Sequence, residues 1–284
     1  MKEYRIHGAS VVKSYRYGNN LEITTSSGVH RQVIKVLPEK KYKNLITGKI
    51  YSMNNVAKTR EDNQKALRRT MSRLRRLIAH NFQGGFSELW VTLTYSEITL
   101  NPDIVYMDFK LFIKRLRKLY PKLEYINVIE PQASGSWHCH VLLKTRDNSH
   151  LYIPNKVLAD AWKKGFTKTK RLKRNDKVGN YLVAYLSNLE VDSKQNGKNK
   201  KVIKGARLYL YPKGVRIYRC SRGIQRPIEQ TGFKADIMKN NGLPVTTEAS
   251  YTKTTSHIID YNTEITYVTE YFNGIGETDE NSES

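Results

Sequence analysis

The stretch WHCHVLL, residues 137–143, places two histidines on either side of one small apolar residue. Side chains alternate between the two faces of a β-strand, so a strand here directs His138 and His140 to one face. The same alternation directs Cys139 and Val141 to the other face, which we expect to lie in a core. Two imidazoles on one face form half of a metal site. The stretch therefore predicts a strand with a metal face and a core face.

The strand before it is predicted to end at Glu130, with residues 131–136 forming the turn of a hairpin. The end of one hairpin strand lies beside the start of the next, so we expect Glu130 next to His138 and His140. Two neutral imidazoles and one carboxylate leave open positions on a divalent ion. A closed structural zinc site needs four ligands, and the nearest thiol, Cys139, is turned away. An open metal site is therefore the favoured interpretation.

The composition points to a polyanionic partner. The chain has 284 residues and a net charge of +23, from 49 Lys and Arg against 26 Asp and Glu. Residues 245–284 hold one lysine and eight acidic residues, so this segment is −7 and the rest of the chain is +30. Such a clustered excess is typical of a nucleic-acid-binding body. A merely basic, soluble surface is the alternative.

Residues 61–81 are predicted to form a strongly basic helix, because apolar residues recur in them at helical spacing. Five arginines crowd its remaining faces: Arg68, Arg69, Arg73, Arg75 and Arg76. Arginine at this density favours contact with DNA phosphates. The alternative is a solvated amphipathic helix that packs on the core.

The element order predicts an α+β fold. We expect strands at 86–95, 123–130, 137–144 and 166–173, and helices at 103–120, 155–164 and 176–190. Gly165 is expected to end the second of these helices, and residues 206–211 and 214–220 are expected to form a hairpin. A β-α-β-β-α-β order predicts a central antiparallel sheet of ferredoxin-like, split β-α-β topology, with helices mainly on one face.

The same pass along the chain predicts three segments. They are an N-terminal β-rich appendage at 1–60, a central domain at 61–225 that includes the basic helix, and an acidic, partly disordered extension at 226–284.

Tyr181 and Tyr185 lie four residues apart on the predicted helix at 176–190, so they share one face. One interpretation makes them core residues that pack with Leu182 and Leu186. The other makes their hydroxyls nucleophiles beside a phosphate that a metal ion polarises. Periodicity alone favours the core.

Three ordered motifs resemble those of the HUH endonucleases, and among these the rolling-circle replication initiators of plasmids and single-stranded phages. The motifs are WVTLTY at 90–95, HCH at 138–140 after a strand that ends in Glu130, and YLVAY at 181–185. The resemblance covers about residues 86–190. It implies the HUH endonuclease fold, which has an RNA-recognition-like split topology.

The resemblance also implies the site and the activity. The metal ligands would be His138, His140 and Glu130, the ion Mg²⁺ or Mn²⁺, and the paired nucleophiles Tyr181 and Tyr185. The protein would nick single-stranded DNA at an origin hairpin, form a 5′-phosphotyrosine link, free a 3′-hydroxyl primer, and rejoin ends at termination. A host helicase and a host polymerase would be its partners.

Two further classes of protein stay open. A transposase or conjugative relaxase of the same superfamily would use the same chemistry. A non-enzymatic binder of RNA-recognition-like fold would instead stack bases on aromatic residues such as Trp90, Tyr95 and Tyr125. The two cysteines, Cys139 and Cys220, and the absence of a membrane-length apolar run favour the cytoplasm and no membrane partner. The pattern predicts no oligomeric state.

Overall fold

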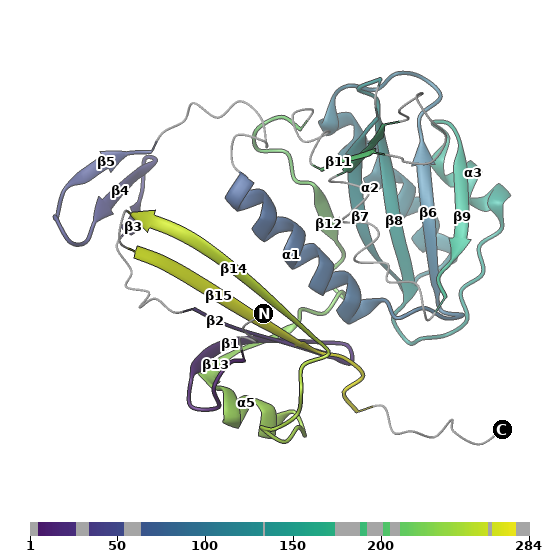
Figure 1. The fold of residues 1–284 in the computed structure, drawn as a ribbon. Helices are drawn as coiled ribbons and strands as arrows, with labels where there is room; N and C mark the ends of the chain where they lie inside the picture. Colours follow the sequence, from purple (N-terminus) through teal and green to yellow (C-terminus); the bar gives the residue numbers. More distant parts are fainter. Residues whose placement is uncertain are drawn as a thin grey trace, which may run out of the picture. The chain divides into compact units, whose positions relative to one another are not determined.

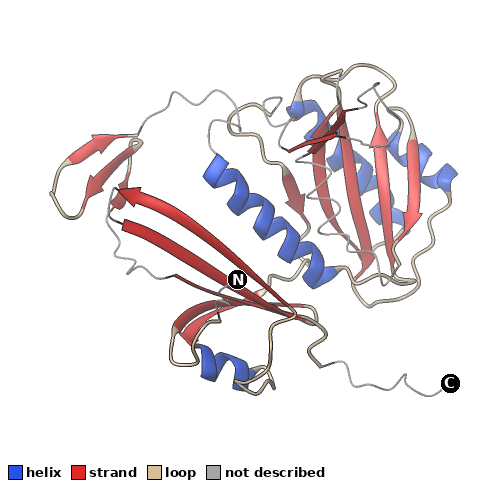
Figure 2. Cartoon of the chain, viewed as in Figure 1, coloured by secondary structure: helices blue, strands red, loops and turns tan. Residues whose placement is uncertain are grey.

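The computed structural model describes residues 5–26, 34–53, 64–132, 134–173, 188–191, 201–204, 211–260 and 263–276. The chain divides into two compact units, one made of Met1–Val56 with Pro227–Ser284 and the other of Ala57–Arg226 (Figure 1). The predicted α+β class is confirmed: the described residues form antiparallel sheets and four helices (Figure 2).

The first unit joins the two ends of the chain in one sheet, of order β13-β1-β2-β15-β14. Its strands are β1 (Val11–Tyr17), β2 (Asn20–Ser26), β13 (Ile228–Phe233), β14 (Tyr251–Asp260) and β15 (Thr263–Phe272), and the unit also contains one described helix, α5 (Lys234–Asn240). Because β1 pairs with β13 and β2 with β15, the segments expected to be separate, 1–60 and 226–284, share this sheet. The described part of the C-terminal segment is therefore largely regular structure.

A buried ion pair ties the N-terminal segment into this unit. Lys234 and Glu270 are each 1% exposed, and their charged atoms lie 2.7 Å apart. Glu270 accepts a hydrogen bond from the Ile6 backbone nitrogen, and Lys234 donates to the Ile6 carbonyl oxygen, both at 2.8 Å. The pair is thus satisfied on both sides, as a buried charge must be.

A separate three-stranded sheet follows β2 in the chain. It consists of β3 (Ile34–Leu37), β4 (Lys41–Asn44) and β5 (Ile50–Ser52), paired antiparallel in that order.

The second unit contains the histidine strand, in a five-stranded antiparallel sheet of order β12-β7-β8-β6-β9. Its elements are α1 (Gln64–Asn81), β6 (Glu88–Thr94), α2 (Pro102–Leu119), β7 (Leu123–Pro131), β8 (Trp137–Thr145), α3 (Asn155–Trp162), β9 (Thr167–Arg171) and β12 (Tyr218–Cys220). A further two-stranded ribbon pairs β10 (Asn188–Val191) with β11 (Lys201–Lys204).

The helices cover both faces of this sheet. Phe109 of α2 packs edge-on against Tyr125, which alternation places on the face opposite the histidines. α1 lies on the histidine face, because Lys144 there donates to the carbonyl oxygen of Asn81, the last residue of α1. The central strands are therefore buried on both sides, apart from the polar end that carries the histidines.

Some local predictions were wrong. The predicted helix at 176–190 cannot extend to its last residues, because Asn188–Val191 is strand β10; most of that helix lies outside the described residues. α3 ends at Trp162, and its left-handed residue is Lys163 (φ 58°) rather than Gly165. Of the predicted hairpin at 206–220, only the second strand is described, and it is shorter and pairs with β7.

Gly165 instead allows two backbones to approach closely. A Cβ there would stand well inside van der Waals distance of the Thr94 carbonyl oxygen and the Ser96 nitrogen. Gly85 also has a positive φ, +139°, but a Cβ there meets nothing within 4 Å. We therefore expect Gly165→Ala to lower the free energy of unfolding by roughly 2 kcal/mol or more beyond the effect of Gly85→Ala. Urea denaturation of both variants measures this difference, and equal losses would contradict it.

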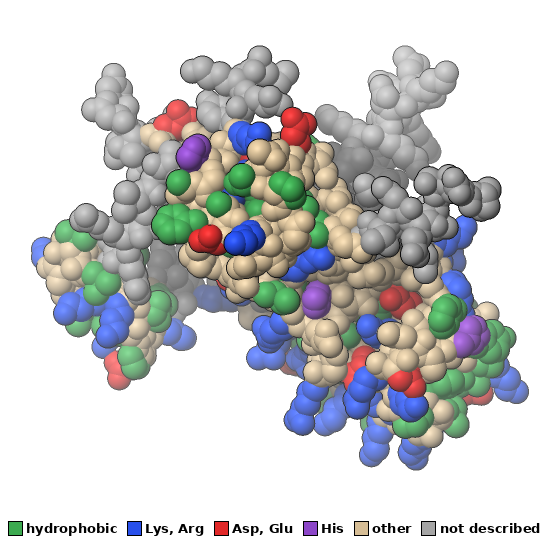
Figure 3. Space-filling view, turned by 90° about the horizontal axis from the view of Figure 1, so that it is seen from below, with side chains coloured by type: hydrophobic (Ala, Val, Ile, Leu, Met, Phe, Trp, Pro, Cys, Tyr) green, Lys and Arg blue, Asp and Glu red, His purple; other side chains and the backbone are tan. Residues whose placement is uncertain are grey.

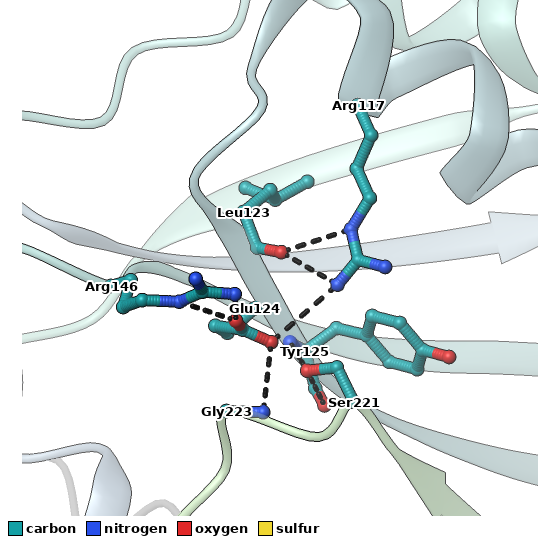
Figure 4. Close-up of polar contacts among 7 residues, drawn as sticks. All are labelled: Arg117, Leu123, Glu124, Tyr125, Arg146, Ser221 and Gly223. Atoms are coloured by element: carbon teal, nitrogen blue, oxygen red, sulfur yellow. Dashed lines mark hydrogen bonds and ion pairs between the residues drawn. The ribbon is translucent and has the colours of Figure 1, made fainter.

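The far end of the histidine face is fixed by Glu124, which is 1% exposed (Figure 4). Arg146 Nε donates to it at 2.9 Å, and the Gly223 backbone nitrogen at 3.3 Å. Burial raises the pKa of the Glu124 carboxyl, but hydrogen bonds from Ser221 and Arg146 outweigh it, so the net pKa is lower than the ordinary value. The ionised carboxylate therefore holds the turn after β12 against β7.

Candidate metal and DNA site

The hairpin predicted from the sequence is present, and it brings the three candidate ligands together. β7 and β8 pair so that Glu130 lies directly opposite His138, and Val128 opposite His140. Residues opposite each other, and those two apart on a strand, share a face. Glu130, His138 and His140 therefore stand at one end of the same face of the sheet.

Glu130 and His140 contact each other directly. His140 Nε2 donates to Glu130 Oε2 at 2.8 Å, and His140 is 5% exposed and Glu130 0%. Trp90 of the neighbouring strand β6 sets its ring edge-on to the His140 ring, with centroids 5.9 Å apart. The carboxylate and the indole thus fix the orientation of this imidazole.

His138 is the more accessible of the two histidines. It is half-buried, and its ring centroid lies 5.6 Å from that of His140. Thr94, opposite it on β6, brings its hydroxyl oxygen to 3.4 Å from His138 Nδ1. Thr94 and Trp90 were not among the residues predicted for the metal site. The alternation of β6 places them on one face, but that β6 adjoins β8 is not visible in the sequence.

The three side chains fit a divalent ion in kind and in position, but they do not form a ready-made cage. Among the described residues, no group of three or more His, Cys, Asp or Glu side chains is arranged to hold a metal ion. Glu130 and His140 instead satisfy each other. Two imidazoles and a carboxylate remain a donor set that suits Mn²⁺ and related ions, so their role as ligands stays a prediction.

The two cysteines lie in very different surroundings, and this gives a test of the strand orientation. Cys139 is fully buried on the core face, where burial raises its pKa to about 12, whereas Cys220 is exposed. We expect a thiol reagent at pH 8 to modify one thiol, Cys220, in the native protein and both in urea. The Cys220→Ser variant should then show no fast thiol. A fast-reacting Cys139 would show that the histidine strand is wrongly oriented.

The predicted nucleophiles, Tyr181 and Tyr185, lie outside the described residues. Nothing in the structure therefore bears on their distance from the histidines.

The arginines of α1 divide into two groups. Arg68, Arg69 and Arg73 are exposed, while Arg75 and Arg76 are half-buried. The inner face of the helix holds Leu67, Met71, Leu74, Leu77 and Ile78 in the core. Burial raises the pKa of Tyr218 on β12, and the charge of Arg73 partly offsets that rise, so Arg73 lies near the histidine face of the sheet. Contact of these arginines with DNA stays a prediction.

The positive charge of the chain belongs entirely to the unit that holds the histidines. Ala57–Arg226 has 36 Lys and Arg against 13 Asp and Glu, which gives +23, and the other unit has 13 of each, which gives zero. Figure 3 shows Lys and Arg side chains gathered on one face of the molecule. The acidic C-terminal segment is therefore balanced by basic residues of its own unit, which also form ion pairs such as that of Lys13 with Glu229.

Comparison with known proteins supports a role in replication. Residues 88–190 match the model of a family of replication-associated proteins, the ORF2 family. The resemblance to rolling-circle replication proteins is thus confirmed at the level of the family, over the part of the chain that holds both the histidines and the tyrosine pair. No curated protein and no solved structure matches the chain. Of the helices in the described residues, none has the length and apolar character needed to cross a membrane.

Proposed function

We propose that this protein initiates rolling-circle replication by nicking one strand of single-stranded origin DNA. A tyrosine hydroxyl attacks the phosphorus, the bond from phosphorus to the 3′ oxygen breaks, and that oxygen leaves as a 3′-hydroxyl once protonated. The 5′ phosphate stays on the tyrosine. A host polymerase would extend the free 3′ end, and a host helicase would open the duplex ahead of it.

The observation that carries this proposal is the buried contact between Glu130 and His140, beside His138, on a sheet face within the matched residues 88–190. A carboxylate and two imidazoles at a polar sheet end are hard to explain as packing alone, because burying a carboxylate is costly. The strand order β7-β8-β6-β9, with α2 and α3 as the two connections, is also the order of a ferredoxin-like split β-α-β sheet. It supports assignment to the HUH endonuclease fold.

Each residue has a separate role in this mechanism. Glu130, His138 and His140 would hold Mg²⁺ or Mn²⁺, which supplies charge neutralisation on the non-bridging oxygens of the phosphate when bound. Glu130 keeps the His140 ring in one orientation through its hydrogen bond. Tyr181 and Tyr185 would supply the two nucleophiles, one to begin a round of replication and one to end it.

The test is a search for the covalent intermediate. Stem-loop oligonucleotides labelled at either end are incubated with the full chain and Mn²⁺, then resolved in denaturing gels. We expect a protein-linked product that carries only the label 3′ of the nick, and a free fragment with a 3′-hydroxyl. A non-enzymatic binder would shift the same oligonucleotides in native gels and give no adduct under any condition.

A further inference from the structure

The outer edge of the sheet presents a row of side chains on the histidine face. β9 is an edge strand, and it pairs with β6 so that Lys168 lies opposite Thr92 and Lys170 opposite Trp90. On its other side, Thr92 lies opposite His140. Lys168 therefore stands in the same row as His140 and on the same face, two strands away.

Phe166 extends this row by one position. The Thr94 nitrogen donates to the Phe166 carbonyl oxygen at 2.9 Å, which continues the β6–β9 register by one more pair. Thr94 is opposite His138 on β8, so Phe166 stands level with His138. We call Phe166, Lys168 and Lys170 the β9 strip.

The two faces of β9 are used differently. On the core face, the Thr169 hydroxyl donates to Asn155 Oδ1 at 3.1 Å, and Arg171 donates to the carbonyl oxygens of Phe86 and Leu151. On the histidine face, Lys168 and Lys170 are exposed, and Phe166 is 74% exposed. A phenyl ring this exposed at the end of a strand gains little from packing, so a ligand is the better explanation for its position.

We propose that the β9 strip binds the single-stranded DNA that flanks the phosphate to be cut. Phe166 would stack on a base, and Lys168 and Lys170 would contact successive phosphates, the combination that proteins use for single strands. Neighbouring strands lie about 4.8 Å apart, so the strip stands roughly 10 Å from the histidine pair, within one or two nucleotides. The inference rests on the proposed function only in placing the cut at the histidines.

The lysines are tested by the salt dependence of binding. The probe is a fluorescent oligo(dT), bound to the full chain in EDTA across a series of salt concentrations. Each phosphate contact on a single strand contributes about 0.7 to the slope of log K against log[salt]. We expect Lys168→Ala/Lys170→Ala to reduce this slope by about 1.4 and the affinity by roughly tenfold. The matched control is Lys110→Ala/Lys114→Ala, which removes two exposed lysines of α2, and it should leave the slope nearly unchanged.

Phe166 is tested by comparing single and double strands. We expect Phe166→Ala to weaken oligo(dT) binding by roughly tenfold, with the salt slope intact and with duplex binding little changed, because only unpaired bases offer a free face. Tyr152→Ala, which removes another exposed ring (65% exposed), is the control. Equal loss on duplex and single strands would overturn the stacking role.

The two proposals fail separately, because oligo(dT) binding needs neither a metal ion nor a tyrosine nucleophile. If the wild-type protein nicks DNA and the β9 strip variants bind oligo(dT) like the wild type, the strip is wrong and the proposed function stands. If no nicking is found but the strip variants lose affinity as described, the strip is supported as a binding surface and the catalytic role falls.

Discussion

Replacing both Tyr181 and Tyr185 by phenylalanine is expected to abolish the covalent protein–DNA adduct and to reduce nicking by roughly a thousandfold or more. Loss of the nucleophile removes the step itself rather than weakening it, and such losses are very large in enzymes that use covalent catalysis. The change deletes two hydroxyl groups and keeps both rings, so it should spare the fold. Adduct formation on a labelled stem-loop measures the result.

The single variants separate the two tyrosines. If the pair divides the work, one single variant should lose the first cleavage, and the other should cleave but fail to rejoin the ends. Tyr152→Phe is the matched control, since Tyr152 is an exposed tyrosine of the same unit. Normal adduct formation by the double variant would show that the nucleophile lies elsewhere in the chain.

The parts of the fold that depend on local sequence were predicted well. The hairpin of β7 and β8 is set by alternation and by the short turn between the strands, so the predicted approach of Glu130 to His138 is what the register shows. The same alternation correctly placed Cys139 in the core. The arginine-rich helix was found from its apolar spacing, and its inner and outer faces follow that spacing.

The parts that depend on distant residues were not predicted. β2 and β15 are separated by more than 200 residues, and nothing in either strand identifies the other as its partner. The contact of Trp90 with His140 likewise depends on β6 lying next to β8, which are separated by a helix and a strand along the chain. Composition misled us at the C-terminal segment, because its acidic residues suggested disorder while its β-branched and aromatic residues form strands.

The second large effect is expected at Glu130. Glu130→Gln keeps the shape of the side chain and can still accept a hydrogen bond from His140, but it removes the negative charge. An ion held by two imidazoles and one carboxylate would then bind much more weakly. Because a bound ion contributes several kcal/mol to charge stabilisation, we expect nicking to fall by roughly a hundredfold or more, and Mn²⁺ binding measured by calorimetry to fall with it.

The matched control is Glu124→Gln, six residues earlier on the same strand and the same face, and equally buried. Its pKa is below the ordinary value of 4.5, so its ionised form stabilises the fold above that pH, and this contribution is lost as the pH falls through the lowered pKa. Glu124→Gln should therefore lose about 1–3 kcal/mol of stability at pH 7, with a weaker dependence on acid. At temperatures where it stays folded, it should bind Mn²⁺ and nick DNA as the wild type does. The reverse pattern, in which Glu130→Gln changes only stability, would mean that the contact between Glu130 and His140 serves the fold and not the chemistry.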